Sequence, residues 1–165
     1  MIPPLEKPWL DLDGYIKVRL LEAKYEAELA AKFLEQGLVR NAAGKAYQAW
    51  KAVLGALAAR SRDRLEGLYP GIRRIGERAV PRVDWIIAIM PSSKMREAAQ
   101  ALRESYGHEV MYYALLALDL HGYQYNGPDR EGVFSRFPSD EQAAKDVEEL
   151  LKGVAKFREV AGGSL

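Results

Sequence analysis

The segment from Arg40 to Arg60, RNAAGKAYQAWKAVLGALAAR, decides the fold of this chain. It combines small residues with two large aromatic residues, Tyr47 and Trp50. The alanines let a neighbouring helix approach closely, because small side chains bring two helix axes together. The segment therefore predicts a long buried helix over residues 39–60, whose core positions are Val39, Ala43, Ala46, Trp50, Val53 and Leu57.

A second long helix is predicted directly upstream, over residues 13–36. Asp11 or Asp13 is a suitable N-cap, and Gly37 is suited to the left-handed conformation that ends a helix. Its apolar residues recur at helical spacing and form the stripe Val18, Leu21, Tyr25, Leu29 and Phe33. Two long helices joined at Gly37 predict an antiparallel helical hairpin.

Further helices are predicted downstream. Ser92 or Ser93 begins a helix that reaches Tyr106, is interrupted by Gly107 and resumes through Leu120. Residues 121–138 are rich in glycine and proline and predict a loop. Ser139 and Gln142 form a capping box for a last helix, whose apolar residues alternate four and three apart.

The middle of the chain, residues 61–91, gives a weaker pattern. Pro70-Gly71 predicts a turn, and Pro81 can begin a short helix through WIIAIM, although that run also fits a buried strand. We interpret 61–91 as an arginine-rich insertion and 1–11, with its three prolines, as an extended arm. The prediction is one domain over residues 1–165: an all-α, up-down bundle of four main helices plus a short one.

Composition excludes several classes of protein. The chain has 165 residues, 48% hydrophobic and 28% charged, with a net charge of +1, which is typical of an ordinary globular domain. The absence of cysteine excludes disulfides and thiol catalysis. The N-terminus lacks the pattern of a signal peptide and no apolar run is long enough to cross a bilayer, so we expect a cytoplasmic protein without a membrane partner.

No spacing of residues predicts a metal site or a cofactor. The sequence contains no glycine-rich phosphate loop and no nucleophile elbow. The two histidines, His108 and His121, are 13 positions apart without an obvious third ligand. We therefore expect neither a metal nor a bound cofactor.

Two groups of polar residues are candidate binding surfaces. Asn41, Lys45 and Gln48 fall at i, i+4 and i+7 and form one line along the helix. That line is either a solvated face or a contact for a phosphate or another ligand. Arg73, Arg74 and Arg78 belong to the insertion, and are either an electrostatic surface for RNA or part of a surface network of ion pairs.

Two motifs carry a resemblance to a known family. NAAGKAYQAW at Asn41–Trp50 and LHGYQYNG at Leu120–Gly127, together with the long hairpin, resemble the HEPN superfamily. Within it the chain is most similar to the archaeal PaREP proteins, a paralogous group of largely unassigned role. The resemblance covers roughly residues 12–60 and 95–160, on either side of the arginine-rich insertion.

This resemblance implies a helical bundle that forms a homodimer. Many HEPN proteins are metal-independent ribonucleases, often toxins neutralised by a nucleotidyltransferase-like partner. Others are non-catalytic and bind nucleotides or partner proteins. The catalytic members carry an arginine followed, after four to six residues, by a histidine, and the two side chains face the cleft between the subunits.

The chain offers two alignments to that catalytic pair. Arg103 and His108 have four residues between them and match the spacing of the catalytic pair. On a continuous helix their side chains would point about 140° apart, so Gly107 would have to break the helix for the two to converge. Alternatively, His121 occupies the family position, since it precedes a loop and a capped helix. Asp119 then lies beside it, either as a site residue or as a structural carboxylate, and His121 has no arginine at the required spacing upstream.

The context favours His121, and with it a non-catalytic protein that binds RNA, a nucleotide or a partner protein. Asn41, Lys45, Gln48 and the arginines of the insertion would be its contact surfaces. The alternative is a metal-independent ribonuclease of toxin–antitoxin type in which Arg103 holds the phosphate and His108 acts as general acid or base. Whether the protein is an enzyme stays open at this point.

Overall fold

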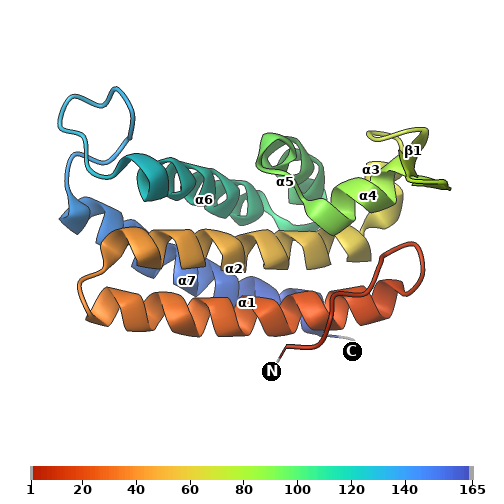
Figure 1. Cartoon of the computed structure of the whole chain (residues 1–165), viewed down its shortest axis with the longest axis horizontal. Helices are drawn as coiled ribbons and strands as arrows, with labels where there is room; N and C mark the ends of the chain where they lie inside the picture. Colours follow the sequence, from red (N-terminus) through yellow and green to blue (C-terminus); the bar gives the residue numbers. More distant parts are fainter. Residues whose placement is uncertain (1, 164–165) are drawn as a thin grey trace.

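A computed structural model describes residues 2–163, and this part of the chain is an all-α bundle with one small β-hairpin (Figure 1). The predicted domain extends to residues 1, 164 and 165, which lie outside the described part. The elements in order are α1 (Leu12–Glu35), α2 (Val39–Arg60), α3 (Arg62–Glu66), β1 (Ile72–Ile75), β2 (Arg78–Pro81), α4 (Arg82–Ile89), α5 (Ser92–Tyr106), α6 (His108–Asn126) and α7 (Asp140–Gly162). The predicted all-α class is confirmed.

Helix α2 is the centre of the bundle. It packs against α1, α6 and α7, and its second half also contacts α4 and α5 (Figure 1). From Ala42 to Ala59, every residue is buried except Lys45, Gln48 and Lys51. The predicted buried helix is therefore confirmed, and its polar residues are confined to one edge.

The hairpin between α1 and α2 turns at Gly37, as predicted. Gly37 has a φ of 73°, a conformation that only glycine adopts without strain. Its N–H donates to Leu34 O and the N–H of Leu38 donates to Phe33 O, so two carbonyls at the end of α1 are satisfied. The predicted caps at Asp11 and Ser139 also form, since each side chain accepts a backbone N–H of the first turn.

The apolar stripe predicted for α1 is wrong in its outer half. Tyr25 and Leu29 have 41% and 36% of their surface exposed. The buried positions of α1 are Tyr15, Ile16, Val18, Arg19, Ala23 and Ala30. The difference arises because α1 contacts both α2 and α7, so the buried residues lie on the sides that face these two helices, and Tyr25 and Leu29 lie at the margin.

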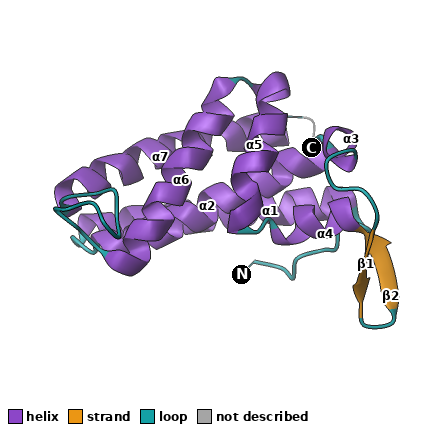
Figure 2. Ribbon diagram, turned by 90° about the horizontal axis from the view of Figure 1, so that it is seen from above, coloured by secondary structure: helices purple, strands orange, loops and turns teal. Residues whose placement is uncertain are grey.

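The predicted interruption at Gly107 is confirmed, because Gly107, with a φ of 86°, separates α5 from α6. The end of α6 and the insertion differ from the sequence prediction. Residues 121–126, predicted as part of a loop, continue α6 to Asn126. The insertion 61–91 contains α3, a β-hairpin and α4, and Figure 2 shows the hairpin extending from the helical body. Residues 85–89 of WIIAIM belong to α4 and Met90 is its C-cap, so the helical alternative for this run is confirmed.

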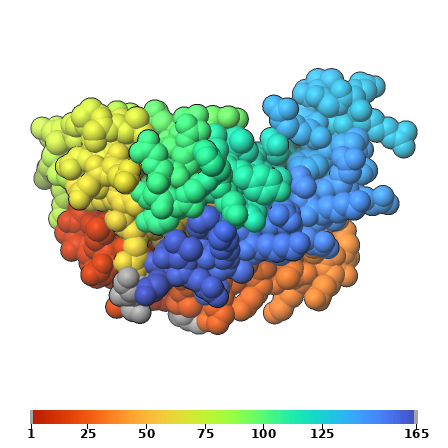
Figure 3. Space-filling model, turned by 180° about the vertical axis from the view of Figure 1, so that it is seen from behind, coloured from red at the N-terminus to blue at the C-terminus, as the bar shows by residue number. Residues whose placement is uncertain are grey.

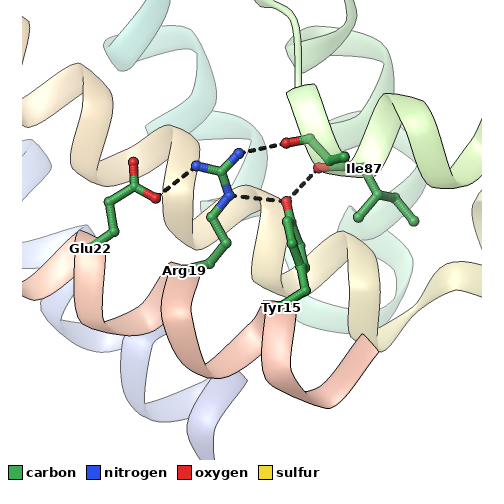
Figure 4. Close-up of polar contacts among 5 residues, drawn as sticks. Tyr15, Arg19, Glu22 and Ile87 are labelled. Carbon is green, nitrogen blue, oxygen red and sulfur yellow. Dashed lines mark hydrogen bonds and ion pairs between the residues drawn. The ribbon is translucent and has the colours of Figure 1, made fainter. Parts of the chain in front are cut away.

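A buried arginine joins α1 to the end of α4 (Figure 4). Arg19 is only 7% exposed; its Nη2 donates to Ala88 O at 2.6 Å and its Nε to the Tyr15 hydroxyl at 3.1 Å. That hydroxyl in turn donates to Ile87 O. The last turn of a helix leaves its carbonyls without partners, and these two side chains satisfy them. Glu22 balances the charge, with Oε2 at 2.7 Å from Arg19 Nη1.

A second buried ion pair joins α3 to α4 and gives a testable prediction. Arg62 Nε donates to Oδ1 of Asp84 at 2.6 Å, and Nη2 donates to Oδ2 at 3.3 Å, while Asp84 is only 4% exposed. We expect Asp84→Ala to lower the free energy of unfolding by about 1.5–3 kcal/mol, the range for hydrogen bonds to charged groups. Chemical denaturation followed by circular dichroism measures it.

Glu66 provides the matched control, because it is the other carboxylate on the same arginine. Its Oε1 lies 3.5 Å from Arg62 Nη1, and its side chain is 60% exposed. Exposed pairs contribute about 0–1 kcal/mol, so Glu66→Ala is expected to change stability little. Equal losses in the two variants would contradict the role assigned to Asp84.

Among the described helices, none combines the length and the apolar character needed to cross a bilayer.

Candidate functional site

The predicted polar line of α2 opens onto a surface pocket. Asn41, Lys45 and Gln48 line a cavity of about 350 Å³, together with Glu26 and Phe33 of α1, Gly44 of α2 and Gln124 of α6. Gly44 allows this assembly, because a Cβ atom there would lie 2.5 Å from Gln124 Nε2. The line is therefore more than a solvated helix face: it forms one wall of a pocket built by three helices.

Arg40 extends the pocket to the end of α6. Its Nε donates to Gln124 O at 3.1 Å and its Nη2 to Tyr125 O at 2.6 Å, so it caps the last turn of that helix. Arg40, Asn41 and Gln124 line a second cavity that shares Asn41 and Gln124 with the first. We call the combined depression the amide groove, lined by Glu26, Phe33, Arg40, Asn41, Gly44, Lys45, Gln48 and Gln124.

Glu26 and Lys45 form an ion pair inside the amide groove, in which Lys45 Nζ lies 3.1 Å from Glu26 Oε2. The lysine ammonium is therefore the charged partner of this buried carboxylate oxygen. Arg40 adds a second positive charge to the lining. The groove presents these charges beside the amide donors and acceptors of Asn41, Gln48 and Gln124.

His121 packs on Tyr47, the residue of α2 that precedes Gln48 of the amide groove. The two rings stack with centroids 4.0 Å apart, and Tyr125 meets His121 edge-on at 5.2 Å. The prediction that a loop begins at His121 is wrong, because α6 continues five residues beyond it to Asn126. The helix continues because Leu120 and Tyr123 are fully buried and Arg40 satisfies its last carbonyls. Sequence alone shows only the glycines that suggest a loop.

Burial makes the neutral form of His121 the stable one. Desolvation lowers the pKa of the imidazole, hydrogen bonding to Gln124 opposes the shift, and the charge of Lys51 reinforces it. Its Nδ1 is buried without a hydrogen-bond partner in the described residues. Burial likewise raises the pKa of the stacked Tyr47, with a smaller opposing effect from Ser92.

This shift predicts a specific dependence of stability on pH. The unfolded chain binds a proton at the ordinary histidine pKa of about 6.5, whereas the folded chain binds it only at lower pH. The contribution of neutral His121 is therefore complete above about pH 6.5 and is lost as the pH falls further. NMR titration of the ring, assigned with His121→Gln, is expected to give a midpoint below that of an unstructured histidine. A midpoint at or above it would contradict the burial argument.

Asp119 is paired with an arginine. Its Oδ1 lies 3.1 Å from Arg136 Nε, in a depression between α6 and the following loop. Burial raises the pKa of the Asp119 carboxyl, and the charges of Arg136 and Arg96 oppose the shift. Asp119 and His121 therefore contact different residues.

Arg103 and His108 lie apart from the amide groove. Gly107 breaks the helix between them, as the catalytic alignment requires, and both residues are exposed. Arg103 lies in the last turn of α5 and His108 begins α6. Within residues 2–163, neither side chain forms a hydrogen bond or an ion pair.

The arginines of the insertion lie on the β-hairpin, at the other end of the molecule from the α1–α2 turn (Figures 1 and 2). Arg73 stacks on Trp85, with its guanidinium carbon 3.8 Å from the ring centroid. Arg74 and Arg78 are exposed, and in the described part of the chain none of the three forms an ion pair. The suggested network of ion pairs is thus absent from these three residues, and they do not join Asn41, Lys45 and Gln48 in one site.

Five residues of the amide groove were not predicted as site residues: Glu26, Phe33, Arg40, Gly44 and Gln124. Glu26 belongs to a mixed-charge helix face, and nothing in the sequence separates it from neighbouring acids. Gln124 belongs to the HGYQYNG segment, and predicting a helix for that segment would have placed Gln124 one turn after His121. Within residues 2–163, no cluster of three or more histidine, aspartate or glutamate side chains is arranged to bind a metal ion.

Comparison with known proteins gives one match. The family model described as the archaeal PaREP1/PaREP8 family matches residues 18–148, which include every residue of the amide groove. No curated protein and no solved structure matches the chain.

Proposed function

This chain belongs to the archaeal PaREP1/PaREP8 family, and we propose that it is a non-catalytic nucleotide-binding protein whose ligand occupies the amide groove. One observation carries the proposal. Three side-chain amides, from Asn41, Gln48 and Gln124, converge on a pocket that also contains the Glu26–Lys45 ion pair. Such a set recognises a ligand rich in hydrogen-bond donors and acceptors.

A nucleotide base fits this chemistry. Side-chain amides form paired hydrogen bonds with base edges that carry an amino group beside an acceptor. An exocyclic amino group is also a suitable donor to the Glu26 carboxylate, beside its ion pair with Lys45. Tyr125, which is 67% exposed beside His121, offers an aromatic face for stacking. Lys45 and Arg40 supply positive charge for a phosphate at the mouth of the groove.

The proposal that the protein is non-catalytic rests on the positions of Arg103 and His108. Both residues are exposed and neither lines the amide groove. The ribonuclease alternative is tested by incubating end-labelled RNA with the protein and EDTA. We expect no cleavage; cleavage abolished in both Arg103→Ala and His108→Ala would establish the ribonuclease instead.

The sharpest test of the ligand site uses Gly44→Ala. The new methyl group would lie 2.5 Å from Gln124 Nε2 and displace that flexible side chain into the groove. Alanine also raises the helix propensity of α2 by up to about 1 kcal/mol, so the fold is retained. We expect titration calorimetry with ATP, GTP, CTP and UTP to detect binding to the wild type and at least tenfold weaker binding to Gly44→Ala.

Gln48→Ala and Gln100→Ala form a matched pair of controls. Gln48 lines the groove, whereas Gln100 is an exposed residue of α5 outside it. Loss of one neutral hydrogen bond weakens binding about 2- to 10-fold, so only the Gln48 variant is expected to change. Absence of nucleotide binding by the wild type, or equal losses in both variants, would refute the proposal.

We also propose that the protein forms the homodimer that the HEPN resemblance implies. The resemblance does not identify the surface that the two subunits share.

A further inference from the structure

The loop between α6 and α7, residues 127–138, has a backbone fixed by its own hydrogen bonds. The carboxylate of Asp129 accepts three of them, from the N–H groups of Glu131, Val133 and Phe134, at 3.0, 2.8 and 2.7 Å. The Nδ2 of Asn126 donates to Phe134 O at 2.9 Å. We call this segment the tip loop.

The base of the tip loop is buried while its tip is exposed. Phe137 is 6% exposed and meets the ring of Tyr123 at 5.6 Å, which fastens the loop to α6. At the tip, Val133 and Phe134 are 67% and 74% exposed. Figure 3 shows the loop projecting from the body of the molecule. Large apolar side chains on a fixed backbone lose little entropy on binding and are typical anchors of protein interfaces.

A complementary apolar groove lies between α1 and α7. Two adjoining pockets of about 360 and 310 Å³ share Ala31 and Leu151 and form one depression, the α1–α7 groove. Its apolar lining consists of Ala27, Ala31, Leu34, Leu151, Val154 and Ala155. In space-filling view, α7 lies beside the α1–α2 hairpin on this face (Figure 3).

The two features carry one complementary set of charges. Glu35 and Glu148 flank one end of the α1–α7 groove, and both are exposed, whereas Lys24 and Arg158 line its other part. Arg130 is exposed in the tip loop, between Asp129, whose carboxylate accepts backbone N–H groups, and the exposed Glu131. Among Glu35, Glu148 and Arg130, none forms an ion pair within residues 2–163. An apolar tip beside a cation thus matches an apolar groove that ends between two acids.

Both features are at the same end of the molecule. The end of α1, the beginning of α7 and the tip loop lie together in Figure 1, opposite the β-hairpin. Two copies can therefore each supply one tip loop and one groove to a shared interface. A reciprocal exchange of this kind closes with two-fold symmetry, whereas a single contact would generate open chains.

We propose that a second copy of this chain covers the α1–α7 groove, with Phe134 of each subunit inserted between α1 and α7 of the other. This rests on the homodimer proposed above and names its interface, and it is independent of the nucleotide. Arg130 of each subunit then faces Glu148 or Glu35 of the other at the acidic end.

Sedimentation velocity of the full chain over a concentration series tests the interface. We expect a dimer for the wild type and, for Phe134→Glu, a dissociation constant raised about 100-fold or more, because the substitution occurs twice in each dimer at an anchor position. Ile72→Glu is the matched control: Ile72 is 68% exposed on the β-hairpin, and the dimer is expected to persist. Unchanged thermal unfolding of the Phe134→Glu monomer would show that only association is lost.

A charge reversal tests the pairing of subunits directly. Arg130→Glu and Glu148→Arg are each expected to weaken the dimer, and the double variant to restore it. A dimer insensitive to Phe134→Glu would overturn this interface while leaving the homodimer intact. A wild-type monomer at every concentration would overturn both the interface and the homodimer, without affecting the nucleotide proposal.

Discussion

Replacing Trp50 by alanine is expected to lower the free energy of unfolding by about 3–5 kcal/mol, the range for loss of a buried large aromatic side chain. Trp50 is fully buried. Its ring meets Phe157 of α7 edge-on at 5.8 Å and Tyr113 of α6 at 5.6 Å, so one side chain of α2 contacts two other helices. Its removal leaves a cavity where three helices meet. Urea denaturation followed by circular dichroism measures the loss.

Trp50→Phe separates the packing of the ring from its polar atom. The indole Nε1 of Trp50 is buried without a hydrogen-bond acceptor in the described residues. Phenylalanine keeps an aromatic ring and removes this unsatisfied donor, so part of the packing loss is offset. We expect Trp50→Phe to retain more than half of the stability that Trp50→Ala loses. Equal losses would show that ring packing at this position is not the source of its stabilising effect.

Replacing Arg19 by methionine is expected to cost about 3 kcal/mol or more. Methionine keeps most of the apolar contacts but leaves Ala88 O without its donor and Glu22 without its buried partner. Removing one member of a buried ion pair typically costs about 3–5 kcal/mol. The side chain of Glu22 is 25% exposed, so we expect a loss in the free energy of unfolding at the lower end of this range. The same denaturation experiment measures the cost.

Arg19→Lys distinguishes the charge from the geometry of the guanidinium. Lysine keeps the positive charge near Glu22, but its single ammonium group cannot reach the Tyr15 hydroxyl, Ala88 O and Glu22 in the fork arrangement of arginine. We expect an intermediate loss. If Arg19→Lys were as stable as the wild type, the hydrogen bonds that join α1 to the end of α4 would contribute little.

The features predicted correctly from sequence are those that depend on neighbouring residues. The caps at Asp11 and Ser139 and the turn at Gly37 each need only a few adjacent residues in the right conformation. The burial of α2 follows from its small residues, which repeat along one segment. The periodic stripe of α1 was less informative, because α1 lies at the margin of the bundle and exposes Tyr25 and Leu29.

The errors arise where distant residues decide the local structure. Residues 121–126 contain a glycine and precede another, a pattern that predicts a loop, yet Arg40 lies more than 80 positions away and caps the helix there. The β-hairpin within 61–91 has a similar cause. Val80 is buried and Arg73 stacks on Trp85, contacts that a local pattern does not reveal.

The candidate site shows the same division. The amino-acid sequence is enough to predict the buried helix α2, the hairpin at Gly37 and the polar line Asn41, Lys45 and Gln48, because helical periodicity fixes which residues of one helix share an edge. The position of this line in the wall of a pocket depends on tertiary packing, since Glu26 and Gln124 reach it from two other helices. The packing of α1 and α6 against α2 sets those long-range contacts, and no spacing within a single helix encodes them.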